Sequence, residues 1–200
     1  MKRINILNKH KVFLIIGRTA TGKSTISKKV ANKLGLTVLK SYTDRPKRRG
    51  ETDENSDHTF ISVSEADEML SHPEQIVAST DSVANGFRYF STVNQVLNSD
   101  FYIIDPIGVE DLKETQEKIK ELKDVEFIEI YIRTPYAKQK NHAHKRGTSF
   151  HDFESRYSQE SKQFSQYEKE QKFKYHVLND NSFDEACEKL ENIIKRELGL

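Results

Sequence analysis

The sequence predicts an α/β fold in which a parallel sheet lies between two layers of helices. Apolar runs and amphipathic stretches alternate along most of the 200 residues, which is typical of strands joined by crossover helices. A glycine-rich loop follows the first apolar run directly, where a strand gives way to a helix. The length suits one compact domain with a small appended lobe, so we expect residues 1–200 to form a single unit.

The core elements follow from hydrophobic periodicity. Val12 to Ile16 form a continuous apolar run and predict a buried strand, and Lys23 to Leu34 carry an apolar stripe at helical spacing that Gly35 ends. Later strands are expected at 101–104, 127–132 and 175–178, and later helices at 110–122 and 183–198. The predicted core therefore comprises residues 1–39, 93–136 and 173–200.

Two segments depart from this alternation. Residues 37–91 contain short β-like pieces, the turn signal Asn85-Gly86 and a small helix that we expect Ser64 to cap, so an inserted lobe is predicted at 40–92. Residues 138–172 are charged and poor in aliphatic side chains, which predicts a mobile helical lid at 137–172.

Composition excludes several classes of partner and location. The chain has 32 basic and 31 acidic residues, so no overall field would attract nucleic acid or anionic lipid. Its longest apolar run, Val12 to Ile16, is too short to span a bilayer, and no signal segment opens the chain, so we expect a cytoplasmic protein. Cys187 is the only cysteine, which excludes an internal disulfide and predicts a structural role in a helix.

The loop after the first strand matches the P-loop (Walker A) pattern G-x-x-x-x-G-K-[ST] at every fixed position. Its glycines let successive backbone N–H groups face an anion, and the positive end of the following helix adds to the attraction. Lys23 can bridge the β- and γ-phosphates of ATP, and the Ser24 hydroxyl can ligate Mg²⁺. The predicted ATP-binding residues are Gly17, Thr19, Ala20, Thr21, Gly22, Lys23, Ser24 and Thr25.

The block Ser41 to Glu51, followed by Asp57-His58-Thr59-Phe60, resembles the guanylate kinase family. That family shows S-x-T-T-R-x-P-R-x-G-E and then G-x-D-Y-x-F at nearly this spacing. The resemblance implies a three-layer P-loop fold and transfer of the γ-phosphoryl group of ATP to GMP, dGMP or a related nucleoside monophosphate. It also implies that Ser41, Arg45 and Arg48 hold the acceptor phosphate, with His58 in the place of the family's tyrosine.

The resemblance extends over nearly the whole chain and implies further site residues. Tyr89 and Ser91 would contact the acceptor phosphate and base, and Asp105 would face the acceptor and the metal-bound waters. Asn179, followed by Asp180, resembles the residue that packs beside adenine. In the lid, Arg146 and Arg156 would close over the phosphates and act with Lys23 and Arg45 in catalysis.

The departures from the family bear on specificity. Phe90 replaces a glycine, and His142 stands where a further lid arginine is usual. The family's guanine-reading glutamate should fall within Gln75 to Thr80, which contains no acid, so we expect acceptance of more than one base.

Because this guanine-reading acid is missing, a P-loop kinase of another small metabolite is an alternative function. A non-catalytic module that binds partner proteins is a second alternative, although such modules typically have a degraded P-loop. The sequence leaves monomer and homodimer open.

Overall fold

In a computed structural model, which describes residues 9–48, 50–81, 86–180 and 182–200, a four-stranded parallel sheet forms the core. The strand order is β6-β1-β7-β8, and all three pairings are parallel. Each predicted core strand is present, and β1 and β7 extend beyond the predicted limits. The bounds are β1 (His10–Ile16), β6 (Phe101–Ile103), β7 (Val125–Arg133) and β8 (Tyr175–Leu178).

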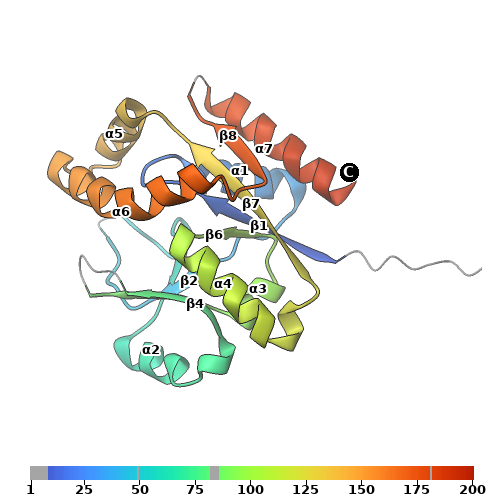
Figure 1. Ribbon diagram of the computed structural model, residues 1–200. Helices are drawn as coiled ribbons and strands as arrows, with labels where there is room; N and C mark the ends of the chain where they lie inside the picture. The colour runs from blue at the N-terminus through green and yellow to red at the C-terminus, as the bar shows by residue number, and fades with distance from the viewer. Residues whose placement is uncertain (1–8, 49, 82–85, 181) are drawn as a thin grey trace, which may run out of the picture.

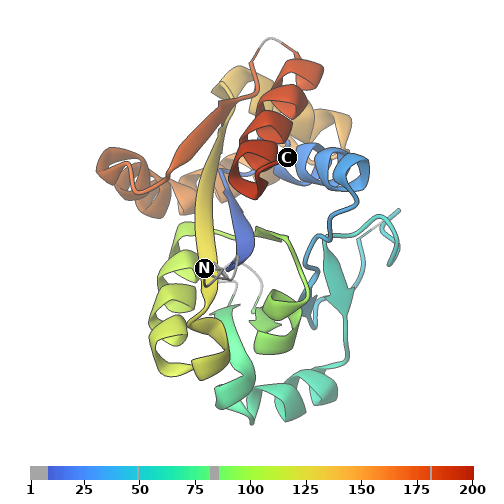
Figure 2. The ribbon, with the colours of Figure 1, turned by 90° about the vertical axis from the view of Figure 1, so that its right-hand side faces the viewer.

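Side chains of β1 alternate between the two helical layers that cover the sheet (Figures 1 and 2). Leu14 belongs to a buried cluster with Leu112 of α4 and Phe164 of α6. Phe13 belongs to a second cluster, with Ile26 of α1 and side chains of α7. The three-layer arrangement is therefore confirmed. The helices of these layers are α1 (Lys23–Leu34), α4 (Pro106–Lys118), α6 (Phe150–Glu170) and α7 (Phe183–Leu198).

The limits of the core helices follow from their caps. α1 and α7 have the predicted limits, and Gly35 ends α1 in the left-handed conformation at φ 68°. The prediction for α4 was wrong, because the helix begins at Pro106 and ends at Lys118, before a 3-10 turn at Lys120–Leu122. Asp105 sets the start, since its carboxylate accepts a hydrogen bond from the Gly108 N–H and proline suits the first helical position.

The segment between the first two core strands carries a second sheet of order β3-β2-β5-β4. β2 pairs with β3 in parallel, whereas β5 pairs with β2 and with β4 in antiparallel fashion. Asn85 of the predicted turn lies outside the described residues. The bounds are β2 (Ser41–Thr43), β3 (His58–Phe60), β4 (Ile76–Asp81) and β5 (Arg88–Thr92), with a 3-10 turn (Pro73–Gln75) before β4 and α3 (Val93–Leu97) after β5.

The small helix of this lobe is α2 (Val63–Leu70), and its N-cap is Ser62 rather than the predicted Ser64. Ser62 accepts a hydrogen bond from the Glu65 N–H, and the Glu65 carboxylate accepts one from the Ser62 N–H. This reciprocal capping box satisfies two backbone donors at once. The helix therefore starts two residues before the predicted position.

The predicted lid segment is helical and contains α5 (Tyr136–Lys145) and α6. The second half of α6 belongs to the main core, because Phe164 and Tyr167 are buried there. The Tyr167 hydroxyl also donates a hydrogen bond to Glu129 of β7. The second half of α6 is therefore part of the packed core, whereas movement of the lid stays a prediction.

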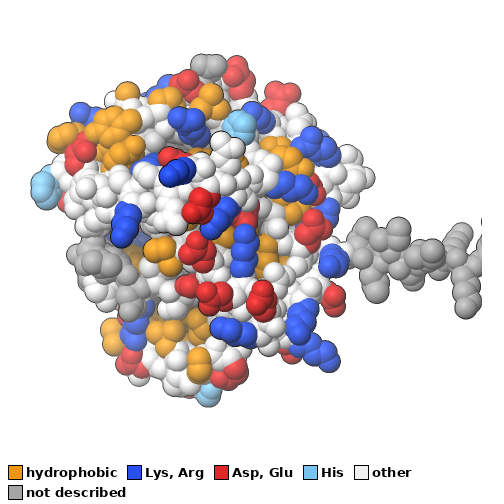
Figure 3. Space-filling view, viewed as in Figure 1, with side chains coloured by type: hydrophobic (Ala, Val, Ile, Leu, Met, Phe, Trp, Pro, Cys, Tyr) orange, Lys and Arg blue, Asp and Glu red, His pale blue; other side chains and the backbone are white. Residues whose placement is uncertain are grey.

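The remaining surface features agree with the composition. Within the described ranges, none of the helices is both long and apolar enough to cross a membrane. Basic and acidic side chains are interspersed over α4 and α6 on the face shown in Figure 3. Cys187 is buried in α7, and burial raises the pKa of its thiol, which fits a structural role.

Candidate active site

The loop between β1 and α1 needs glycine at both fixed positions. A Cβ atom at Gly17 would lie 2.4 Å from the Ile132 carbonyl oxygen. Gly22 has φ 92°, and a Cβ there would lie 2.9 Å from the amide nitrogen of Asn179. Neighbouring side chains hold the loop in this shape, because Asn179 and Thr134 each donate a hydrogen bond of 2.9 Å to the Thr21 carbonyl.

The Lys23 ammonium lies inside this loop. Its Nζ donates hydrogen bonds to the carbonyl oxygens of Gly17 and Arg18, the latter at 2.8 Å. Burial lowers the pKa of Lys23, and the nearby carboxylate of Glu160 opposes that shift. A cation surrounded by loop carbonyls can turn toward an anion that enters the loop. Ser24 follows in the first turn of α1.

Two cavities, each of about 540 Å³, flank the loop. The first cavity lies between the lobe, the end of β6 and the first half of α6. The second cavity lies between α5, the start of α7 and the loop residues Ala20, Gly22 and Thr25. Residues of the loop do not line the first cavity, but the Thr19 N–H donates a 2.7 Å hydrogen bond to Glu160 in its wall.

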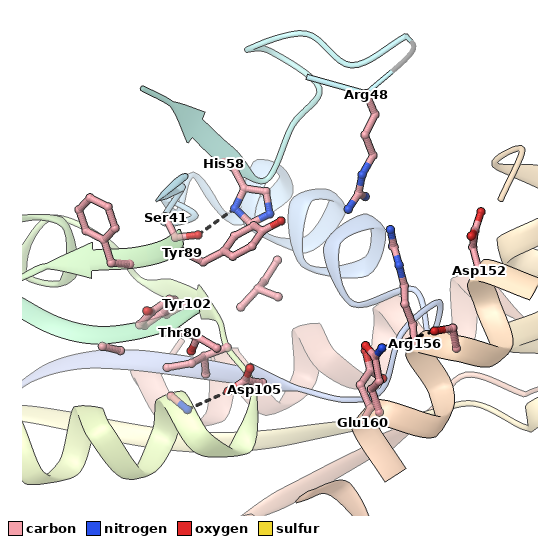
Figure 4. A pocket seen from close by; sticks show the side chains of 17 residues that line it. Ser41, Arg48, His58, Thr80, Tyr89, Tyr102, Asp105, Asp152, Arg156 and Glu160 are labelled. Carbon is pink, nitrogen blue, oxygen red and sulfur yellow. Dashed lines mark hydrogen bonds between the residues drawn. The ribbon is translucent and has the colours of Figure 1, made fainter. Parts of the chain in front are cut away.

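Side chains of the lobe form a polar wall of the first cavity (Figure 4). Ser41 Oγ and His58 Nδ1 are 2.9 Å apart, and the rings of His58 and Tyr89 meet edge to face at 5.2 Å. Burial and the positive charge of Arg45 lower the pKa of His58 to about 4, so its imidazole is neutral at pH 7. The sequence predicted that Ser41, His58 and Tyr89 belong to one site, and all three line the same cavity.

The opposite wall carries a half-buried carboxylate. Asp105 lines the cavity at the start of α4, where burial raises its pKa although the Gly108 N–H and Lys23 oppose that shift. Ala78 and Thr80 of β4 line the same region, and neither has a carboxylate. Ser79 does not line the cavity, because successive side chains of a strand point to opposite faces.

Ser91 does not line the cavity either. It is fully buried and accepts a 2.8 Å hydrogen bond from the Tyr102 hydroxyl. Tyr102 itself lines the cavity, and sequence reasoning did not assign it. The only signal for Tyr102 was its place in the strand that leads to Asp105.

The predicted arginines are divided between the two cavities. Arg48 and Arg156 line the first and Arg146 lines the second. Partial burial, with the charges of Arg156 and Arg45, lowers the pKa of Arg48. Partial burial and Arg156 also lower the pKa of Arg146. Such mutual repulsion favours an anion between these side chains.

Arg45 is placed differently from the other predicted arginines. Its guanidinium makes two 2.7 Å hydrogen bonds to Glu51, is 5% exposed and does not line the cavity. This pairing raises the pKa of Arg45 and lowers that of Glu51 to about 2. The buried Nε of Arg45 has no partner among the described residues. Glu51 was part of the quoted motif, but it was assigned no role.

Two further residues were missed because their partners are distant in sequence. Arg18 is buried and donates hydrogen bonds to Glu168 and Ser161 of α6. Its guanidinium also lies 5.1 Å from the ring centre of Tyr157. Glu160 contacts the loop from the same helix. No local pattern in the sequence predicts either contact.

The second cavity contains the residues predicted beside the adenine. Asn179 lines it and is buried, and Asp180 forms a 3.5 Å ion pair with Lys138 of α5. His142, at the position of a usual lid arginine, has Nδ1 at 3.0 Å from the Ala20 carbonyl oxygen. A carbonyl only accepts hydrogen bonds, so this ring nitrogen donates and α5 is held on the loop.

The parallel sheet and the glycine-rich loop between β1 and α1 together define a P-loop NTPase fold. The family profile named guanylate kinase matches residues 9–197. The chain therefore belongs to the guanylate kinase family and is a nucleoside monophosphate kinase.

Among solved structures, guanylate kinase from Anaplasma phagocytophilum is similar in fold, with a TM-score of 0.62 and 20% sequence identity. The match covers 94% of this chain and 87% of that chain. A search of the curated proteins finds no match.

Proposed function

We propose that this kinase transfers the γ-phosphoryl group of ATP to GMP, dGMP or a related nucleoside monophosphate. The observation that carries the proposal is that the P-loop lines one polar cavity and is hydrogen-bonded to the wall of another. Thr19 faces Glu160 of the first cavity, whereas Ala20 and Gly22 line the second. Two nucleotides bound in these cavities would meet at the loop, as direct transfer requires.

The first cavity is proposed to hold the acceptor. Its phosphate would lie beside Ser41, Arg48 and Tyr89, where hydroxyl and guanidinium donors suit a dianion. Its base would lie toward Ala78 and Thr80 of β4, and Asp105 would face the acceptor from the start of α4. Neutral His58 would keep the Ser41 hydroxyl in place through their hydrogen bond.

Arg45 is proposed to act on the acceptor phosphate from behind this wall. Glu51 fixes its guanidinium in one orientation, and Tyr89 lies close enough to raise the pKa of Arg45. The Arg45 charge therefore adds to the positive potential at Tyr89 and Arg48. It would contact the phosphate directly only if its pairing with Glu51 loosened.

The second cavity is proposed to hold the adenosine of ATP, with Asn179 beside the adenine. The phosphates would extend along the loop toward Lys23, which bridges the β- and γ-phosphates. Arg146 and Arg156 would complete the cationic surroundings as the lid closes and excludes water.

A magnesium site fits the residues present. Within the described ranges, no group of three or more His, Cys, Asp or Glu side chains is placed to hold a metal. Mg²⁺ in kinases is commonly held by few protein ligands together with phosphates and waters, so the Ser24 hydroxyl suffices on the protein side. When bound, the ion neutralises charge on the phosphates.

The proposed chemistry is direct in-line transfer without a covalent enzyme intermediate. Phosphoryl transfer depends mainly on positioning and on electrostatic stabilisation of the transferred group. The loop N–H groups, Lys23 and the arginines supply both functions. The acceptor phosphate is itself the nucleophile, so direct transfer needs no side chain as a nucleophile.

Product analysis tests this function. The protein is incubated with ATP, Mg²⁺ and each of a panel of ribo- and deoxynucleoside monophosphates, and products are identified by ³¹P NMR. We expect ADP and the matching nucleoside diphosphate in equal amounts. Turnover of no nucleoside monophosphate would contradict the proposal. Binding of ATP without any transfer would favour the non-catalytic module, and transfer only to another metabolite would favour the other alternative.

A further inference from the structure

A carboxylate is hydrogen-bonded to a backbone N–H of the P-loop. Glu160 Oε2 accepts a 2.7 Å hydrogen bond from the Thr19 N–H, and the charges of Lys23 and Arg18 act on the same side chain. Burial nevertheless raises the pKa of Glu160. In Figure 4 its side chain lies beside that of Arg156 at the edge of the first cavity.

α6 is fixed to the loop next to this contact. Arg18, the residue before Thr19, donates hydrogen bonds to Ser161 and Glu168 of α6. Its guanidinium also stacks on Tyr157 and on Phe164, at 5.1 and 5.5 Å from the ring centres. These contacts keep the helix on the loop, so the position of Glu160 is set by the fold.

The loop cannot hold Glu160 and a phosphate chain on the same N–H group. Backbone N–H groups of a P-loop are the donors that cradle phosphate oxygens. A carboxylate within hydrogen-bond distance would also repel a polyphosphate, because like charges at short range in a partly buried site disfavour each other. A phosphate that binds to the Thr19 N–H would therefore displace the Glu160 carboxylate.

We propose that Glu160 is a positioning residue that occupies part of the phosphate site while nucleotide is absent and leaves it when a phosphoryl donor binds. The inference rests on the proposed function, since it requires polyphosphate in the P-loop. Arg156 precedes Glu160 by one turn of α6 and lines the first cavity. The two side chains lie beside each other in Figure 4, so displacement of the Glu160 carboxylate would change the charge next to Arg156 and communicate occupancy of the loop to an arginine of the acceptor site.

Calorimetry with ADP alone, without acceptor, tests the inference. Glu160→Gln keeps the size and removes the charge, and Glu160→Ala removes the hydrogen bond as well. We expect both variants to bind ADP about tenfold more tightly than the unsubstituted protein, because a charge-assisted hydrogen bond no longer has to be broken. Glu170→Gln is the matched control, since Glu170 lies on the same helix and pairs with Lys172. Its ADP affinity should be unchanged.

Steady-state kinetics provide a readout that a merely structural role would not give. We expect the KM for ATP to fall in Glu160→Gln, with a much smaller change in kcat. A variant that only loosened the fold would bind ADP more weakly. If the unsubstituted protein binds ADP and neither Glu160 variant binds it more tightly, the inference is wrong while the proposed function stands. If no form of the protein binds ADP, both are wrong.

Discussion

The two cavities beside the P-loop differ in how their walls are held. In the first cavity, side chains are fixed by hydrogen bonds within the protein, as between Ser41 and His58 and between Tyr102 and Ser91. In the second, Asn179 and His142 are also hydrogen-bonded to the loop, but the lining adds exposed cations such as Lys145. A preorganised wall discriminates between ligands, whereas exposed charges attract any polyphosphate. Selectivity of this kinase should therefore reside mainly in the first cavity.

Lys23→Ala should have the largest effect, because Lys23 lies in the P-loop, which lines the second cavity and is hydrogen-bonded to the wall of the first. It removes charge stabilisation that acts mainly in the transition state, so we expect kcat to fall by about 10²-fold or more. The melting temperature should change little. Stopped or coupled assays at saturating substrates measure kcat, and an unchanged kcat would refute the role assigned to Lys23.

Arg48→Ala and Arg45→Ala should separate the two cavities. Each removes positive charge near the acceptor phosphate, so we expect acceptor affinity to fall by about tenfold or more while ATP affinity persists. Arg45→Ala should also lower the melting temperature, because Glu51 loses its partner. Calorimetry with each nucleotide distinguishes the effects. Loss of ATP binding with unchanged acceptor affinity would show that the cavities are assigned the wrong way round.

Thr80→Glu should sharpen selectivity in the first cavity. A carboxylate at this position would face the base, and it could accept hydrogen bonds from the N1 and N2 donors of guanine. We expect kcat/KM for GMP relative to dTMP to rise by about tenfold. Ser79→Glu is the control, because Ser79 does not line the cavity. Equal ratios in the two variants would mean that the base lies elsewhere.

His58 should change the pH dependence of stability below pH 6.5. Its pKa is about 4 in the folded protein and 6.5 when unperturbed, so the unfolded chain binds more protons between these values. The contribution of neutral His58 to the free energy of unfolding is complete above pH 6.5 and is lost as the pH falls toward 4. The free energy of unfolding changes over this range by up to about 1.4 kcal/mol per pH unit. Denaturant unfolding at several pH values should show a smaller slope in His58→Gln than in the exposed-site variant His144→Gln. Equal slopes would contradict the assignment.

Much of the core fold was predictable because its signals are local. Apolar runs gave the strands, and Gly35 marked the end of α1. The predicted limits of α4 were wrong, because charge and hydrophobic periodicity indicate a later start than the one that the cap at Asp105 and Pro106 sets. Ser62 and Ser64 each precede an acidic residue by three positions. This pattern alone does not decide which of the two serines caps α2.

The candidate site was predictable only where residues belong to short motifs. The P-loop motif predicted Lys23, and the block around Ser41 predicted Arg48 and His58, which line the first cavity. The contact between Thr19 and Glu160 joins residues 141 positions apart, and no single sequence signals such a pair. The pairing of Arg45 with Glu51 is local, but its consequence, a guanidinium outside the cavity, depends on tertiary burial.

Acceptor selectivity is the most direct test of the account. The measurement is kcat/KM for GMP, dGMP, dTMP and the other common monophosphates under identical ATP and Mg²⁺. Because Ala78 and Thr80 of β4 offer the base no carboxylate, we expect more than one base to be accepted, with a flat profile across the panel. A preference for GMP above about 10³-fold over every non-guanine acceptor would contradict the account, because another residue would then supply the guanine contact.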